Sequence, residues 1–200
     1  MDFLTIENEV ESEYRIQRSR FIGFLFPIKN QDDFYNKYCN IKKIYFDSTH
    51  IAFAYRLIDK GNNIVEHYSD DGEPAKTAGY PLLYILKQKK LIQAGTLVVR
   101  YFGGIKLGTG GLSKAYSTTL INALNSVELM IFQKKIDIKA ITVNDKQYKL
   151  VEICKKLNAN NLRIEYLEDR TIIYFTIAES NLEILKNKLN FDRDIEINII

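Results

Sequence analysis

Two segments of the chain combine residue types that could carry chemistry. The first, Ser69–Pro81, places Asp70, Asp71 and Glu73 within four positions, among residues that favour turns. Crowded carboxylates repel one another, so a hard cation, a helix N-terminus or basic side chains must offset their charge. The segment is therefore either a metal or phosphate-transfer site, or a solvated turn whose acids cap the next helix. We favour capping, because no second set of metal ligands accompanies these acids.

The second segment, Val98–Tyr116, is dominated by glycine. Five glycines occur within nine residues, at Gly103, Gly104, Gly108, Gly110 and Gly111. Because a predicted strand precedes them and a predicted helix follows, we expect their backbone N–H groups to lie at a helix start, where they attract anions. Arg100, Lys106 and Lys114 add positive charge, and Tyr101 offers a flat surface for a base.

The established phosphate-binding loops do not match this segment. A P-loop requires Gly-Lys-Ser/Thr, but Thr109 and Gly110 follow Gly108, and the dinucleotide motif requires glycine where Ser113 stands. Two interpretations stay open. The glycines let a strand and a helix pack closely and turn sharply, or they form a surface that meets a ligand or partner.

The elements that must position these segments follow from the hydrophobic pattern of the N-terminal part. Strands are predicted at a pair spanning Tyr14–Ile28 and at Ile51–Ile58, Ile64–Tyr68 and Thr96–Tyr101. Helices are predicted at Asp32–Ile44, from a cap at Thr77 to Lys90, and at Leu112–Val127.

The C-terminal part reads as β-α-β-β-α-β, which is typical of a ferredoxin-like fold. Its predicted strands are Ile138–Val143, Leu162–Leu167, Thr171–Ile177 and Ile195–Ile199. The helix Asp145–Leu157 is expected to begin at an Asn144 cap and to bury Tyr148, Val151, Ile153, Cys154 and Leu157; Ser180 is expected to cap the second helix. We therefore predict an α+β protein with an N-terminal α/β domain at 1–134 and a ferredoxin-like domain at 135–200.

Composition limits the function classes. The chain has 200 residues, of which 46% are hydrophobic and 26% charged, a balance typical of a globular protein, and no apolar run is long enough to cross a membrane. The N-terminus lacks a secretion signal, and the two cysteines lie far apart, so a cytoplasmic protein without a disulfide framework or zinc site is expected. No metal ion or cofactor is expected, no catalytic set is recognisable, and the oligomeric state is not predicted.

Charge is divided unequally along the chain. The net charge of the chain is +3, but residues 1–136 hold 18 Lys and Arg against 14 Asp and Glu, a net charge of +4. All ten glycines also lie in this part, between Gly23 and Gly111. An acidic partner should therefore prefer the N-terminal part.

Taken together, these segments resemble the YigZ/IMPACT family. The resemblance rests on four blocks: Ser19–Ile22, Thr49–Arg56, Ser69–Pro74 with Thr77–Gly79, and Arg100–Gly108 with Gly110–Leu112. It implies an N-terminal domain like the second domain of small-subunit ribosomal protein five and a C-terminal domain similar to the end of elongation factor G. It also implies a link to translation, because eukaryotic IMPACT relatives compete for the activator of a stress kinase. Lys114 stands where the family usually has arginine.

From these observations we predict a non-enzymatic regulator of translation or stress that binds RNA, the ribosome or a translation-associated protein. The alternative is an enzyme or nucleotide-binding protein in which the glycine-rich segment holds phosphate and the acidic turn holds magnesium. A third is a pure protein-interaction module. The predicted binding residues are Arg20, Asp70, Asp71, Glu73, Arg100, Tyr101, Gly103, Gly104, Lys106, Gly108, Gly110, Gly111 and Lys114.

Overall fold

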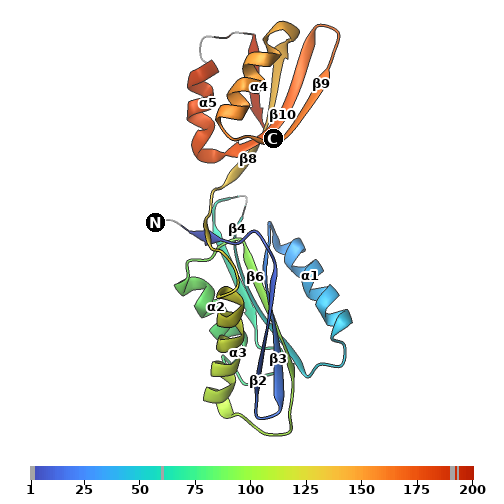
Figure 1. Ribbon diagram of the computed structural model, residues 1–200, viewed down its shortest axis with the longest axis vertical. Coiled ribbons are helices and arrows are strands. Elements are labelled where there is room, and N and C mark those ends of the chain that lie inside the picture. Colours follow the sequence, from blue (N-terminus) through green and yellow to red (C-terminus); the bar gives the residue numbers. More distant parts are fainter. Residues whose placement is uncertain (1–2, 60, 190–191, 193) are drawn as a thin grey trace. The chain divides into compact units, whose positions relative to one another are not determined.

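The chain divides into two compact units, Met1–Phe132 and Gln133–Ile200, in a computed structural model (Figure 1). The structure describes residues 3–59, 61–189, 192 and 194–200. The division after Phe132 falls two residues before the boundary expected from sequence. Among the described residues, no helix has the length and apolar character needed to cross a membrane.

The N-terminal unit is built on a five-stranded antiparallel sheet in the order β2-β3-β6-β4-β5. These strands span Val10–Ile16 (β2), Ser19–Pro27 (β3), His50–Ile58 (β4), Ile64–Ser69 (β5) and Ala94–Tyr101 (β6). A further two-stranded pair joins Leu4–Thr5 (β1) to Met130–Ile131 (β7). The three central strands β3, β6 and β4 are buried along most of their length, because helices cover both faces of the sheet.

Alternation along β3 fills two separate cores. Phe21 and Leu25 pack with the helices α2 (Gly79–Gln88) and α3 (Gly108–Leu124), whereas Ile22 and Phe24 pack on the other face with α1 (Gln31–Ile44). Figure 1 shows α1 alone on one side of the sheet and α2 with α3 on the other. A residue's parity in a strand therefore decides which helices it meets.

The C-terminal unit is a four-stranded antiparallel sheet in the order β11-β8-β10-β9. Its strands span Lys135–Val143 (β8), Asn160–Tyr166 (β9), Arg170–Ala178 (β10) and Ile195–Ile199 (β11), and its helices span Gln147–Lys156 (α4) and Leu182–Leu189 (α5). The first and third strands are central and both helices share one core with them, as in a ferredoxin-like fold. The predicted α+β fold class is confirmed.

Three expected details of helix starts are wrong. The Thr77 hydroxyl does not cap α2 but donates to the Pro74 carbonyl at 2.7 Å. Short 3₁₀ turns, Asn144–Lys146 (η1) and Glu179–Asn181 (η2), precede α4 and α5, so Ser180 lies within a turn. The Asn144 side chain instead accepts a hydrogen bond from Thr171 and donates to the Glu168 carbonyl.

The face that α4 buries differs from the expected one. Tyr148, expected in the core, is 78% exposed, whereas Leu150 is fully buried beside Ile153, Cys154 and Leu157. These four buried residues follow the i, i+3, i+4, i+7 spacing of one helix face, and Tyr148 lies about 200° round the helix from Leu150, on the opposite face.

Candidate functional site

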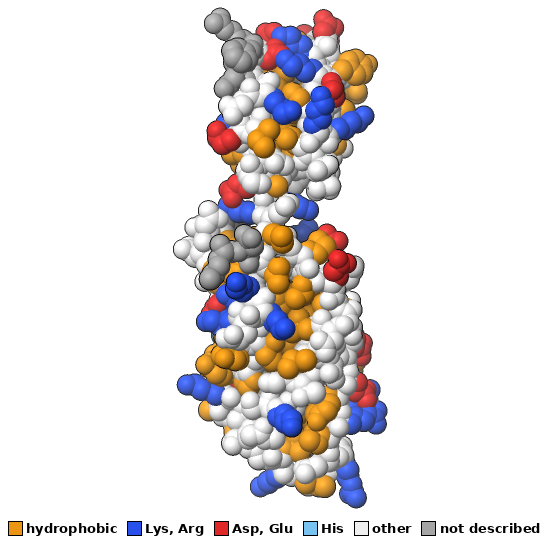
Figure 2. Space-filling model, turned by 60° about the vertical axis from the view of Figure 1, so that its left-hand side comes forward, with side chains coloured by type: hydrophobic (Ala, Val, Ile, Leu, Met, Phe, Trp, Pro, Cys, Tyr) orange, Lys and Arg blue, Asp and Glu red, His pale blue; other side chains and the backbone are white. Residues whose placement is uncertain are grey.

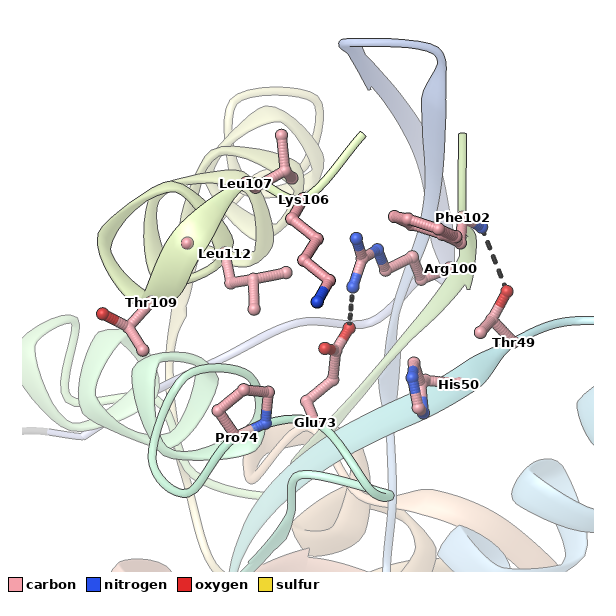
Figure 3. A pocket seen from close by; sticks show the side chains of 11 residues that line it. Thr49, His50, Glu73, Pro74, Arg100, Phe102, Lys106, Leu107, Thr109 and Leu112 are labelled. Carbon is pink, nitrogen blue, oxygen red and sulfur yellow. Dashed lines mark hydrogen bonds and ion pairs between the residues drawn. The ribbon is translucent and has the colours of Figure 1, made fainter. Parts of the chain in front are cut away.

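A pocket of about 420 Å³ lies in the N-terminal unit where four segments meet. The start of β4, the turn before α2, the end of β6 and the first turn of α3 all contribute (Figure 3). Its lining residues are Thr49, His50, Glu73, Pro74, Arg100, Phe102, Lys106, Leu107, Gly108, Thr109 and Leu112. The acidic turn and the glycine-rich segment, 30 residues apart in sequence, thus share one cavity.

A buried ion pair forms the floor of this pocket. Arg100 Nη1 lies 2.6 Å from Glu73 Oε1, and the two side chains are only 6% and 3% exposed. Tyr116 donates its hydroxyl to the same carboxylate oxygen at 2.8 Å. The Arg100 guanidinium also lies 5.5 Å and 5.3 Å from the ring centres of Phe21 and Phe102. A charge this deeply buried requires a partner, and Glu73 supplies it.

Tyr116 acts as a permanent donor in this arrangement. Burial, reinforced by the negative charge of Glu73, raises the pKa of Tyr116 far above its ordinary value. The phenol therefore keeps its proton near neutral pH and donates it to the Glu73 carboxylate that pairs with Arg100.

The acidic turn is used by the fold. Asp70 accepts hydrogen bonds from the backbone N–H groups of Lys76 (2.8 Å), Ala78 (3.0 Å) and Gly79 (2.8 Å), and so caps the start of α2. Asp71 accepts from the Ile51 N–H at 2.6 Å. The capping interpretation is confirmed for Asp70. Within the described residues, no cluster of three or more His, Cys, Asp and Glu side chains is arranged to hold a metal ion.

The glycine-rich segment is only partly a loop. Gly103 and Gly104 lie in the loop after β6, whereas Gly108, Gly110 and Gly111 form the first turn of α3. A side chain at Gly103 would place its Cβ 2.1 Å from the Arg18 carbonyl carbon, and Gly104 and Gly108 adopt positive φ angles of 84° and 69°. These three positions require glycine for backbone reasons.

Gly110 differs from the other glycines in this segment. It does not adopt a positive φ, and an added Cβ would meet nothing within 4 Å. Because glycine is also a poor helix former, the fold gives no reason for a glycine here. The second interpretation of the segment, a surface that meets a ligand, therefore retains support at Gly110.

The N-terminus of α3 has no internal cap. Leu107 occupies the cap position without a side-chain hydrogen bond, and no acidic residue lies in the first turn. The first N–H groups of a helix have no partner within the helix, and the aligned peptide dipoles place positive charge there. Gly108 and Thr109 line the pocket, so this positive end opens into it.

Several predicted site residues lie elsewhere. Arg20 and Tyr101 are opposite each other in the β3–β6 register, on the sheet face that carries α1, away from Arg100. Arg20 pairs with Glu13 at 2.7 Å, and the Tyr101 hydroxyl donates to Asp47 at 2.7 Å. The other predicted residues outside the pocket lining are Asp70, Asp71, Gly103, Gly104, Gly110, Gly111 and Lys114.

The pocket also includes residues that sequence reasoning did not select. Thr49 and His50 lie in one of the blocks that carried the family resemblance, which was a usable signal. His50 Nδ1 lies 2.6 Å from the Asp71 carbonyl oxygen and donates to it. The apolar residues Pro74, Leu107 and Leu112 had no signal, because their role depends on how separate segments meet.

Positive charge is dispersed on the face of the molecule that Figure 2 shows. On the face shown in Figure 2, Lys and Arg side chains of the N-terminal unit stand singly among apolar patches. A long continuous basic stripe does not cross this face. Cationic groups converge instead in the pocket, where Figure 3 shows Arg100 and Lys106 reaching toward the same carboxylate of Glu73.

Comparison with known proteins places this site in a family. The sequence pattern of the Impact N-terminal domain matches residues 17–124, a range that contains the whole pocket lining. The chain belongs to the IMPACT family. An IMPACT family member of Haemophilus influenzae is 31% identical over 189 residues, which cover 94% of this chain and 91% of that protein. The resemblance read from the sequence is thereby confirmed.

Other IMPACT relatives match over shorter stretches. YvyE of Bacillus subtilis is 38% identical over 125 residues, 62% of this chain and 57% of YvyE, so the match spans little more than half of that relative. A solved structure of a hypothetical protein is 23% identical, with a TM-score of 0.70 over 100% of this chain and 97% of that chain. That likeness shows that the fold of this chain occurs in another solved protein.

Proposed function

We propose that this IMPACT family member is a non-enzymatic regulator of translation that binds RNA through the mouth of the pocket. The observation that carries the proposal is the convergence of the uncapped α3 N-terminus, Lys106 and Arg100 on one cavity. Phosphate groups are the anions that backbone N–H groups and basic side chains recognise in nucleic acids. The link to translation comes from the family, whose eukaryotic members regulate that process.

The chemistry of the pocket favours binding over catalysis. Its lining includes neither serine nor cysteine, Glu73 is held in an ion pair, and His50 is bonded to the Asp71 carbonyl. A nucleophile activated by a neighbouring base, the usual requirement for covalent catalysis, is not assembled by these lining residues. The three carboxylates of the acidic turn bond to separate parts of the chain, so the magnesium alternative gains no support from their arrangement.

Reversal of charge at Lys106, which lines the pocket, and at Lys114, which lies on α3 outside the lining, tests this proposal. In the variant Lys106→Glu/Lys114→Glu, we expect weaker retention of single-stranded RNA and a flatter salt dependence. Each lost phosphate contact should reduce the slope of log K against log salt by about 0.7. Filter binding across a salt series measures both quantities. The matched control is Lys42→Glu/Lys43→Glu, which makes the same charge change in α1 on the other sheet face.

Two results would contradict the proposal. One is unchanged RNA binding by the Lys106→Glu/Lys114→Glu protein, with its fold shown intact by circular dichroism. The other is retention of a translation-associated protein after nuclease treatment without any direct RNA binding, which would favour a protein-interaction module.

A further inference from the structure

We infer that the pocket between β6 and α3 is a binding site for a terminal phosphate group, carried by the 5′ end of an RNA strand or by a free nucleotide. For the RNA source, this inference rests on the function proposed above and specifies which part of the strand the protein recognises.

Arg100 is buried at the pocket and only partly hydrogen-bonded. Its guanidinium lines the pocket, although the residue is only 5% exposed. Nη1 is paired with Glu73, but Nε has no acceptor among the residues that the structure describes. Buried guanidinium N–H groups are normally satisfied, and a cation that is only partly paired favours an anion beside it. Nε itself is buried, so an anion would meet Arg100 through the part of the side chain that lines the pocket. Arg100 is thus an independent sign of a ligand, separate from the helix end.

Helix α3 begins at the same pocket that Arg100 lines. The first turn of the 17-residue helix α3 presents backbone N–H groups without a side-chain cap. Gly108 and Thr109 of this turn line the pocket, so the N–H groups of the helix start lie at its wall. A phosphate group bound here would accept from backbone N–H groups while Lys106 and Arg100 balance its charge.

The net positive charge of the pocket matches a terminal phosphate group better than an internal phosphodiester. Arg100 and Glu73 cancel, Lys106 adds one unit, and the helix end adds about half a unit, so the pocket holds about +1.5. A phosphate monoester carries about −1.5 to −2 near neutral pH, whereas an internal phosphodiester carries about −1. In addition, only an end group can enter deeply enough to meet a residue as buried as Arg100.

The size and the lining of the cavity suit a nucleotide. A volume of about 420 Å³ lies within the range of pockets that hold small ligands, roughly 300–1,000 Å³. Pro74, Leu107 and Leu112 provide apolar walls, and Phe102, 45% exposed, offers a ring beside the opening. These walls suit the nucleoside attached to the phosphate, so the ligand is a nucleoside monophosphate or the first nucleotide of a strand.

The test compares two RNA strands that differ only in the group at their 5′ end. Fluorescence anisotropy with the full-length protein measures the affinity for one single-stranded oligoribonucleotide that carries either a 5′-phosphate or a 5′-hydroxyl. We expect the phosphorylated strand to bind at least about tenfold more tightly, the contribution of one charge-assisted hydrogen bond. Competition with a nucleoside monophosphate distinguishes the sources: competition at similar affinity favours a free nucleotide, and its absence favours an RNA end.

A substitution at Thr109, which lines the pocket, provides the matched variants. Thr109→Asp places a carboxylate in the first turn of α3, where acids stabilise a helix, so the protein should remain folded while the preference for a 5′-phosphate is lost. Thr109→Asn introduces nearly the same volume without the charge and should retain most of the preference. Thermal melting verifies that both variants fold.

The outcomes separate this inference from the proposed function. Equal affinity for both strands would overturn the terminal-phosphate site, yet salt-sensitive RNA binding would leave the proposed function standing. Conversely, nucleotide binding that Thr109→Asp abolishes, in a protein that binds no RNA, would support the site and overturn the RNA function. A preference that persists in Thr109→Asp would place the phosphate elsewhere and contradict the inference.

Discussion

Gly103 and Gly110 belong to the same glycine-rich segment, but the fold requires only the first. A Cβ at Gly103 would lie 2.1 Å from the Arg18 carbonyl carbon and 2.3 Å from the Ser19 nitrogen, contacts with backbone that cannot move aside freely. Gly103 also donates its N–H to the Ser19 hydroxyl at 3.1 Å, which fixes the loop against the β2–β3 turn. No comparable neighbour exists around Gly110.

The same substitution at these two positions should therefore have opposite effects on stability. We expect Gly103→Ala to lower the free energy of unfolding by about 2 kcal/mol or more, because the loop must move to relieve the overlap. Gly110→Ala should raise it by up to about 1 kcal/mol, because alanine is the better helix former. Urea denaturation monitored by circular dichroism measures both. Equal losses of stability would mean that Gly110 has a structural role that the geometry does not reveal.

At the level of elements, the start of α2 shows how a helix can be capped from a distance. Asp70 lies eight and nine residues before the N–H groups of Ala78 and Gly79, well outside the usual capping position. The turn at Asp70–Lys76 bends back so that one carboxylate serves three N–H groups. Thr77 is closer in sequence but bonds only within the turn.

This arrangement predicts which of the two residues matters more for α2. We expect Asp70→Ala to lower the free energy of unfolding by about 2 kcal/mol, because three backbone N–H groups lose a charged acceptor. Thr77→Ala should lower it by about 1 kcal/mol, the contribution of one hydrogen bond. Guanidinium denaturation of both variants, in parallel, gives the comparison. If Thr77→Ala proved the more harmful change, the assignment of the cap to Asp70 would be wrong.

For the whole molecule, we propose that the two units fold as separate domains. Each has its own hydrophobic core, and the C-terminal core holds a natural reporter, Cys154, at 1% exposure. Burial raises the pKa of the Cys154 thiol to about 12, so the folded protein offers almost no reactive thiolate at this position. The other cysteine, Cys39, is exposed on α1, so we expect it to react in the folded protein.

Labelling of Cys154 can therefore measure how the C-terminal unit opens. In a Cys39→Ser background, we expect Gly103→Ala to destabilise the N-terminal unit while the rate of Cys154 modification stays unchanged, because units that fold separately open independently of each other. A thiol reagent at moderate denaturant concentration, followed by absorbance, provides the measurement. Faster labelling in step with the loss of N-terminal structure would show a single cooperative unit and would refute the two-domain proposal.

The sequence alone determined the family, the fold class and the order of the longer helices and strands, but not the short strands β1 and β7. Long motif blocks such as Arg100–Gly108 identify the family, and local hydrophobic periods identify helices and strands, because both are properties of neighbouring residues. The sequence could not decide whether the glycines form a ligand-binding surface or allow a sharp turn with close packing. That choice depends on the atoms that surround each glycine Cα, which only the tertiary structure gives.

Only the tertiary structure decided which candidates form a site. Arg100 and Tyr101 are adjacent in sequence, yet strand alternation sends the first to the pocket and the second to the opposite face with Arg20. Glu73 became the partner of Arg100 and Asp70 the cap of α2 because the chain bends at that turn. Contacts between distant residues depend on strand register and on how helices pack, and neither is encoded in local spacing.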